Sequence, residues 1–237
     1  MILESIFNRN QDDPHPIVDF NNSFFSSIDQ NFYLKDYDFV VFDTELTGMD
    51  YKKDEIISIG AVKIRNMRIK AGETFHSYVR PESLEPRDST LVHRITPQQL
   101  KDAPPLDQVL KEFIAYISGA LLVGHYVDLD VSFINRAAKR LFNGTLKNPC
   151  LDTMRLAQAY TAMSRTQYHD RFNLQVTYNL ADLVKVYGLP SFVQHDALGD
   201  ALQTAYLFLY LTHKVRRHGY ATLRELFGAG RSLMSIY

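Results

Sequence analysis

Short apolar runs between residues 39 and 79 predict three strands that follow one another along the chain. Phe39-Val40-Val41-Phe42 is a continuous apolar run, which is typical of a strand buried on both faces near the centre of a sheet. Residues 56–64 form a second β-type run, and residues 65–68 indicate a turn into a third strand that ends near Val79. Three strands joined by short turns predict an antiparallel meander.

The period of the apolar residues becomes helical after Pro81. Thr96 followed by Pro97 indicates a helix N-cap with proline at the first helical position. Helical spacing predicts helices over residues 106–117, 134–141, 154–162, 180–187 and about 196–209. Short apolar runs predict a fourth and a fifth strand at residues 121–123 and 150–151. This order of elements predicts one α/β domain with a mixed sheet.

Residues 1–35 differ from the rest of the chain because they are rich in Asn, Asp, Ser and Phe and show no sustained period. This composition predicts an N-terminal extension of low order that Phe24, Phe25 and Phe32 hold against the core. We therefore expect an extension over residues 1–35, a folded domain over residues 36–215 and a C-terminal tail over residues 216–237.

Composition and charge exclude several classes of protein. The 237 residues include 26 Lys and Arg against 27 Asp and Glu, so the chain does not coat nucleic acid by charge alone. Ser118 and Gly119 interrupt the longest apolar stretch, so no membrane-spanning helix is expected. Residues 1–10 lack a basic leader before an apolar stretch, which predicts a cytoplasmic protein. The single cysteine, Cys150, has no neighbours at zinc-site spacing, so no disulfide or structural zinc is expected.

Two carboxylates follow the most apolar strand of the chain. Asp43 and Glu45 stand at positions i and i+2, so their side chains project to the same face of a strand. Such a pair repels itself unless a cation or a shared proton intervenes, and oxygen ligands of this type suit Mg²⁺ or Mn²⁺. The alternative is that both side chains point into solvent after the strand ends. The spacing of the two carboxylates alone favours neither interpretation over the other.

Three further polar residues are candidates for the same chemistry. Asp200 lies one turn into a mostly apolar helix, either as a ligand or as an exposed carboxylate favoured by the helix dipole. Asp130 precedes a helical pattern, where an N-cap is the alternative role. His195 can meet Asp200 only from the preceding loop, where it could take a proton from water, and Asp196 is expected to cap the helix.

Three segments together resemble the signatures of a known family. The segment FDTELTG at residues 42–48, with EIISIGAV at residues 55–62, resembles the first signature of the DEDDh exonucleases. Residues 123–134 resemble the second signature and residues 195–200 the third, and the likeness covers about residues 37–213. This is the DnaQ-like family of the proofreading epsilon subunit of bacterial DNA polymerase III. The resemblance implies a ribonuclease H-like fold, with a mixed five-stranded sheet whose first three strands are antiparallel.

The resemblance also implies a role for individual residues. It makes Asp43, Glu45, Asp130 and Asp200 the ligands of two divalent cations, Mg²⁺ or Mn²⁺, and Asp128 a chance neighbour. It makes His195 the general base and gives Glu45 a part in catalysis. It places substrate contacts at Thr47, Gly48, Met49, His93, His125 and Phe133.

The activity implied by the resemblance is 3′ to 5′ exonuclease activity that releases nucleoside 5′-monophosphates from single-stranded nucleic acid, with DNA favoured. A DNA polymerase subunit is then a candidate partner. Two alternatives are an inactive domain of the same fold that binds nucleic acid or a polymerase, and an exonuclease directed to RNA or dinucleotides. Leu46, Arg94 and Tyr126 stand where family members often have Thr, Gly and Asn, which leaves the substrate preference open.

Overall fold

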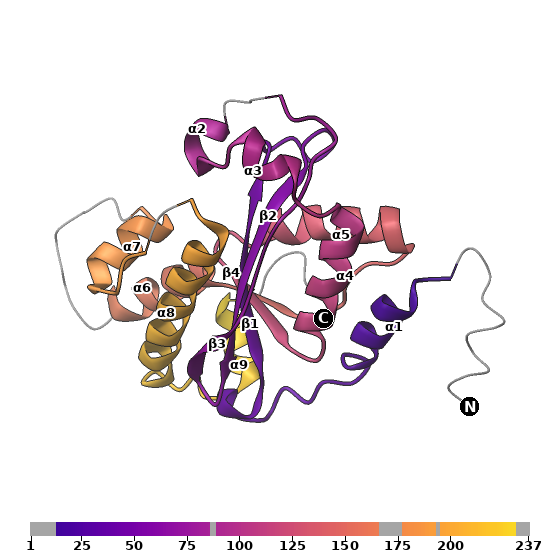
Figure 1. Cartoon of the computed structure of the whole chain (residues 1–237). Helices are drawn as coiled ribbons and strands as arrows, with labels where there is room; N and C mark the ends of the chain where they lie inside the picture. Colours follow the sequence, from indigo (N-terminus) through magenta and orange to yellow (C-terminus); the bar gives the residue numbers. More distant parts are fainter. Residues whose placement is uncertain (1–12, 86–88, 166–176, 193–194, 231–237) are drawn as a thin grey trace.

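A five-stranded mixed sheet forms the centre of the protein. The computed structural model of the chain describes residues 13–85, 89–165, 177–192 and 195–230 (Figure 1). The strands lie in the order β3-β2-β1-β4-β5, with β1 antiparallel to β2, β2 antiparallel to β3, and parallel pairing from β1 through β4 to β5. They are β1 (Phe39–Leu46), β2 (Ile56–Arg65), β3 (Arg68–Tyr78), β4 (Leu121–Gly124) and β5 (Cys150–Asp152). The predicted meander and mixed sheet are confirmed.

Helices cover both faces of this sheet (Figure 1). One face carries α1 (Pro16–Ser23), α4 (Leu106–Ile117) and α5 (Asp128–Phe142). The other carries α6 (Thr153–Arg165), α7 (Leu180–Tyr187), α8 (Ala197–Arg216) and α9 (Leu223–Gly230). Two short helices, α2 (Thr90–His93) and α3 (Pro97–Lys101), stand at one end of the sheet, and the 3-10 turn η2 (Leu34–Asp36) precedes β1.

The apolar run in β1 explains this layering. Val40 and Phe42 pack into the core under α4 and α5, whereas Phe39 and Val41 pack into the core under α8. All four side chains are at most 1% exposed, because successive strand residues alternate between two covered faces. The same alternation sends Asp43 and Glu45, which follow in the strand, toward the α8 side.

The N-terminal segment is more ordered than predicted. Pro16 opens α1 at the first turn of the helix, and His15 Nδ1 accepts a hydrogen bond from the Ile17 N–H. Val18 is fully buried in the α4–α5 core. The expectation of low order is therefore wrong for this helix, because eight residues are too few for a helical period to stand out.

The aromatic residues that follow α1 behave differently from one another. Phe25 is buried in the core, as expected of a residue that holds the extension to the domain. Phe24 and Phe32 are about half exposed, and the ring of Phe24 lies beside Gly119 of the domain, 3.4 Å from the position that a Cβ atom would take there. Part of the predicted C-terminal tail also folds onto the core, because α9 buries Leu223 and Leu226 beside α6. None of the described helices is long and apolar enough to cross a membrane.

Candidate active site

Three carboxylates from two distant segments meet at the end of β1. Asp43 and Glu45 share the face of the strand that α8 covers, and Asp200 lies in the first turn of α8. One carboxylate oxygen from each residue lies within 4.8 Å of the others. A site with three convergent carboxylate oxygens has the ligand chemistry that Mg²⁺ and Mn²⁺ prefer.

A glycine in β2 allows α8 to come this close. Gly60 pairs with Asp43 in the antiparallel register. A Cβ atom at Gly60 would lie 2.2 Å from the carbonyl carbon of Ala197 and from the backbone nitrogen of Leu198. The N-terminus of α8 therefore rests on the β2 backbone, and this contact brings Asp200 to the strand.

The carboxylates hold protons strongly when no cation neutralises them. Desolvation raises the pKa of Asp43 well above its ordinary value, and the charges of Asp130, Asp200 and Glu45 raise it further. Desolvation, followed by the charges of Asp200 and Asp130, raises the pKa of Glu45 to about 8. Desolvation also raises the pKa of Asp200, although the Asp200 carboxylate accepts a hydrogen bond from His195. Divalent cations would remove this repulsion, so the donor set fits them.

Asp130 approaches from the opposite side of β1. It lies in the first turn of α5 and is not one of the three carboxylates that converge. The backbone N–H of Thr44 donates to Asp130 Oδ1 at 3.0 Å, and the Thr44 hydroxyl donates to the same oxygen. Desolvation raises the pKa of Asp130 to about 7, and the two bonds from Thr44 oppose this rise. Asp130 is thus beside Asp43, whose pKa its charge raises, without joining the group of three.

His195 lies in the loop that precedes α8, where the sequence predicts it. Its φ of +59° is in the left-handed region, and its backbone N–H donates to Asp200 Oδ2 at 2.9 Å. The next residue, Asp196, caps α8 by accepting from the Gly199 N–H at 2.9 Å, as predicted. The backbone of His195 thereby orients the carboxylate of Asp200.

The predicted substrate-contact residues after β1 form a tightly held loop. The Thr47 hydroxyl donates to Asp54 Oδ1 at 3.0 Å. A Cβ atom at Gly48 would lie 2.4 Å from the carboxylate of Asp54, and Met49 is 83% exposed. Asp54 is a buried supporting residue that sequence reasoning missed, since it lies between Lys52-Lys53 and Glu55 in a charged stretch that looks like a solvated turn.

One ring nitrogen of His93 is hydrogen-bonded, and the other has no partner among the described residues. Its Nδ1 accepts a hydrogen bond from the Ile95 N–H at 3.0 Å. Its Nε2 is buried and has no hydrogen-bond partner among the residues that the structure describes. Burial and the nearby charge of His195 lower the pKa of His93, so the neutral ring presents an N–H at Nε2.

His125 and Phe133 make contacts inside the protein, and their role in substrate contact stays a prediction. Nε2 of His125 lies 2.9 Å from the carbonyl oxygen of Tyr178, and Nδ1 lies 2.8 Å from the hydroxyl of Thr153. Burial lowers the pKa of His125 to about 4, so the ring is neutral with both nitrogens occupied. The Phe133 side chain is fully buried, and the guanidinium of Arg136 lies 4.8 Å from its ring centroid.

Asp152 is another buried carboxylate, to which sequence reasoning assigned no role, and it supports the turn before Asp130. Asp152 is 1% exposed and accepts hydrogen bonds from the N–H groups of Tyr126 at 3.1 Å and Met154 at 2.9 Å. Arg155 pairs with both Asp152 at 3.9 Å and Asp128 at 3.7 Å. Asp128 therefore belongs to this supporting network and lies outside the group of three carboxylates.

Known proteins resemble this chain over most of its length. The sequence model of the exonuclease family RNase_T matches residues 40–208. A DNA polymerase III PolC-type of Caldanaerobacter subterraneus subsp. tengcongensis is 37% identical over 189 residues, which are 80% of this chain and 12% of that protein. A DNA polymerase III subunit epsilon-like protein of Rhodobacter capsulatus is 36% identical over 192 residues, covering 81% of this chain and 25% of that protein. The chain thus spans a quarter or less of these two relatives.

Solved structures share the fold at low sequence identity. E. coli exonuclease I in complex with a dT13 oligonucleotide has a TM-score of 0.64 and 16% identity, covering 77% of this chain and 42% of that chain. Exonuclease X in complex with 5′ overhanging duplex DNA has a TM-score of 0.55 and 20% identity, covering 79% of this chain and 99% of that chain. These likenesses confirm the ribonuclease H-like fold. By the match over residues 40–208, the chain belongs to the RNase_T exonuclease family, whose DnaQ-like members the sequence resembles.

Proposed function

We propose that this protein is a metal-dependent 3′ to 5′ exonuclease. It hydrolyses phosphodiester bonds at the 3′ end of single-stranded nucleic acid, with DNA favoured, and releases nucleoside 5′-monophosphates. The observation that carries the proposal is the convergence of Asp43, Glu45 and Asp200 within 4.8 Å, with Asp130 held beside Asp43. The dT13 complex of exonuclease I and the polymerase III names of the relatives support the choice of DNA.

The donor set fits two divalent cations, Mg²⁺ or Mn²⁺. Asp43, Glu45 and Asp200 would hold one cation, and Asp43 with Asp130 would hold the other. When bound, such ions help to ionise an attacking water and stabilise the departing 3′ oxygen. The donors are all carboxylate oxygens, and their pKa values are raised first by desolvation and then by neighbouring acidic charges. Hard cations neutralise such carboxylates.

The protein's own groups then position water and substrate. The imidazole of His195 accepts a proton from the attacking water, and the Glu45 carboxylate orients that water. The free Nε2–H of His93 donates to an oxygen of the terminal nucleotide. Thr47, Gly48 and Met49 contact the same nucleotide, with Met49 offering an exposed apolar side chain. His125 and Phe133 stabilise the walls of the site from inside the protein.

A DNA polymerase subunit is the proposed partner, supported by the names of the relatives. A cytoplasmic location remains a prediction from the sequence. The partner and the location are proposals, because this chain matches only 12% and 25% of the length of the two relatives.

A cleavage assay tests the proposal. The purified chain is incubated with a 5′-labelled dT20 oligonucleotide and Mg²⁺, and we expect a ladder that shortens from the 3′ end together with free dTMP. The matched control is Asp200→Asn, which keeps the side-chain shape and removes the charge. An equal concentration of RNA or of a dinucleotide compares the alternative substrates. No cleavage of any of the three by the wild-type protein would favour an inactive binding domain.

A further inference from the structure

A pocket of about 380 Å³ lies at the end of the molecule opposite to the carboxylates. It lies between the last turns of α8, the β2–β3 hairpin and the segment around η2. Its apolar lining includes Leu34, Met67 and Leu209. Helix α8 connects the two regions, with Asp200 in its first turn and Arg216 as its last residue. At 1.5 Å per helical residue, these residues are about 24 Å apart.

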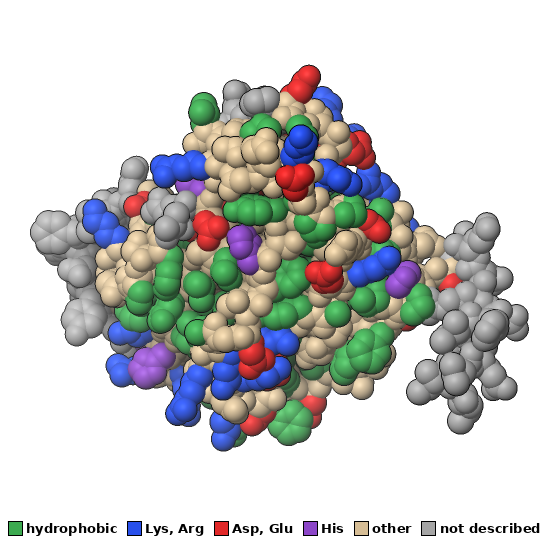
Figure 2. Space-filling model, viewed as in Figure 1, with side chains coloured by type: hydrophobic (Ala, Val, Ile, Leu, Met, Phe, Trp, Pro, Cys, Tyr) green, Lys and Arg blue, Asp and Glu red, His purple; other side chains and the backbone are tan. Residues whose placement is uncertain are grey.

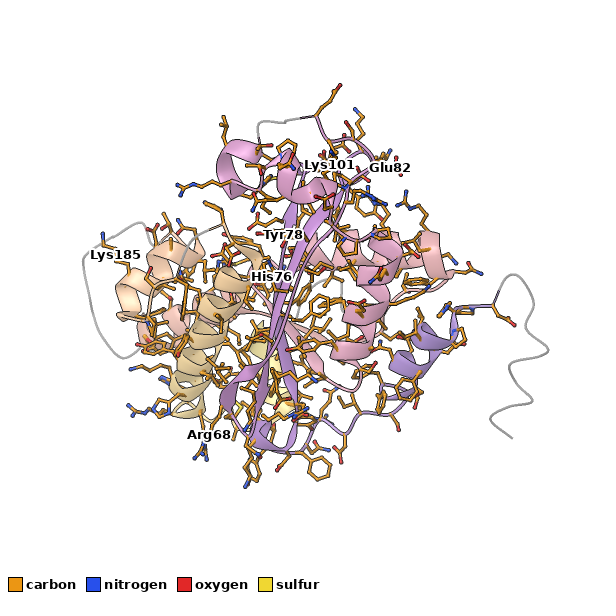
Figure 3. The ribbon with its side chains drawn as sticks, in the orientation of Figure 1. Arg68, His76, Tyr78, Glu82, Lys101 and Lys185 are labelled. Atoms are coloured by element: carbon orange, nitrogen blue, oxygen red, sulfur yellow. The ribbon has the colours of Figure 1, made fainter. Side chains whose placement is uncertain are left out.

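The rim of this pocket is basic. Lys35, His213 and Arg216 line it and are exposed, whereas no described Asp or Glu lines it. Within the described part of the chain, neither Lys35 nor Arg216 forms an ion pair. Arg68 projects from the hairpin at the same end (Figure 3), and Figure 2 shows Lys and Arg side chains gathered around the lower end of α8. This concentration contrasts with the net charge of −1 for the whole chain.

The helix dipole explains only part of the basic charge around the pocket. Cations in the last turn of α8 stabilise the negative end of the helix dipole, which accounts for Arg216. Lys35 comes from η2, far from α8 in the sequence, so the dipole of α8 does not account for its place at the pocket. Two elements thus present unpaired cations to one pocket, which points to an anionic ligand.

The hairpin keeps a strained residue at the pocket wall. Asn66 and Met67 form the turn between β2 and β3 with φ values of +52° and +55°. The second position of such a turn favours glycine, and a side chain there costs about 1 kcal/mol. Met67 nevertheless stands there and lines the pocket. A side chain kept at such a position is consistent with a binding role.

An exposed aromatic ring completes the pattern. Tyr33 lines the pocket with 56% of its surface exposed, and the adjacent Phe32 is 57% exposed. Exposed aromatic rings beside unpaired cations are the features that bind single-stranded nucleic acid, because bases stack on the rings while phosphates pair with the cations. We propose that this pocket is a second nucleic-acid site that anchors a strand at a distance from the carboxylates. The choice of ligand rests on the proposed function.

The distance between the sites allows them to be tested separately. A stacked strand rises about 3.4 Å per nucleotide, so about seven nucleotides would span the separation. A dT20 oligonucleotide can therefore occupy both sites at once, whereas dT3 can occupy only one of them at a time. Binding is measured by fluorescence anisotropy of 5′-labelled dT20 and dT3 in EDTA, which prevents metal-dependent cleavage, at several salt concentrations.

The test variant combines Lys35→Ala with Arg216→Ala. We expect dT20 and dT3 both to bind more weakly, dT20 by about tenfold or more, and the logarithmic salt dependence for dT20 to fall by about 1.4. The control variant combines Lys139→Ala with Lys147→Ala, which removes the same charge from exposed positions elsewhere and should leave dT20 affinity near wild type. Arg216→Lys keeps the charge and should retain most of the affinity. Circular dichroism verifies that each variant is folded.

Several results would overturn the proposal. These are failure of the wild-type protein to bind dT20, equal dT20 affinity in the test and control variants, or an equal loss in both. A decaglutamate peptide that binds the wild type but not the test variant, with dT20 binding unchanged, would instead identify a protein-docking surface. Cleavage of dT3 with Mg²⁺ is independent of this pocket, so its absence would contradict the exonuclease proposal without affecting this one.

Discussion

Thr44 donates two hydrogen bonds to a single oxygen of Asp130, one from its backbone N–H and one from its hydroxyl. The two residues are 86 positions apart in the sequence, and Thr44 stands between Asp43 and Glu45 on the opposite face of β1. Strand β1 therefore directs the carboxylates of Asp43 and Glu45 to one face, and on the other face it holds the carboxylate of Asp130 through Thr44. The end of β1 thus positions acidic side chains on both faces of the sheet.

The hydroxyl of Thr44 should matter for activity more than for folding. Hydrogen bonds to charged groups contribute about 1.5–3 kcal/mol, so Thr44→Val should lower kcat about tenfold or more and raise the Mg²⁺ concentration needed for half-maximal rate. Thr44→Ser keeps the hydroxyl and should retain most of the rate. A Thr44→Val protein with a wild-type Mg²⁺ dependence would show that the bond does not position Asp130.

The metal-free protein should lose stability as the pH rises. Desolvation and repulsion raise the pKa of Glu45 to about 8, and desolvation raises that of Asp130 to about 7, so the folded state binds more protons than the unfolded chain. Their destabilising effect is absent below the ordinary carboxyl pKa values near 4 and is complete above about pH 8. Thermal melts in EDTA should therefore show a falling Tm between pH 5 and pH 8.5.

Two controls separate this effect from general alkaline destabilisation. Addition of Mg²⁺ should flatten the pH dependence, because bound cations favour the charged carboxylates. Asp200→Asn in EDTA should flatten it in part, because one repelling charge is gone. A Tm that is constant, or that rises over this range in EDTA, would contradict the electrostatic description of the site.

Gly60 should not tolerate a side chain. A Cβ atom there would lie 2.2 Å from backbone atoms of Ala197 and Leu198, so Gly60→Ala should cost about 1–3 kcal/mol of stability and displace Asp200. Gly72→Ala is the matched control in β3, because nothing lies within 4 Å of its Cβ position. Urea unfolding and exonuclease rates measure both effects. Wild-type activity in a folded Gly60→Ala protein would mean that α8 can shift without loss of function.

Two departures from the family pattern have a backbone consequence. Arg94 and Tyr126 stand where members often have Gly and Asn, and both have φ values in the left-handed region, +58° and +55°. Gly and Asn adopt this region more easily than other residues, so Arg94→Gly should raise the free energy of unfolding by about 1 kcal/mol. Gln98→Gly, on the exposed surface of α3, should lower it by a similar amount. Urea titrations measure both, and a destabilised Arg94→Gly would show that the arginine side chain makes compensating contacts.

Local patterns predicted the strand end and the helix boundaries, because they depend on residues that are close in the sequence. The two-residue period placed Asp43 and Glu45 on one face, and Thr96 with Pro97 marked a helix start that the structure completes with a capping box to Gln99. The eight-residue helix α1 escaped prediction because it has only about two turns.

Features that depend on distant contacts could not be predicted in the same way. The bonds from Thr44 to Asp130 and from Tyr126 to Asp152 join segments that meet only in the folded chain. The occupied nitrogens of His125 were equally hidden, because Tyr178 lies 53 positions away. A resemblance can suggest which residues act together, but only the fold shows which of their atoms are already engaged.

Calorimetry of Mn²⁺ binding shows whether the carboxylates form the metal site, when the wild type is compared with Asp43→Asn, Asp130→Asn and Asp200→Asn. The wild type should bind two ions. Asp130→Asn and Asp200→Asn should each weaken a different one, and Asp43→Asn should weaken both. Equal Mn²⁺ binding by Asp43→Asn and the wild type would contradict the claim that these carboxylates form the metal site.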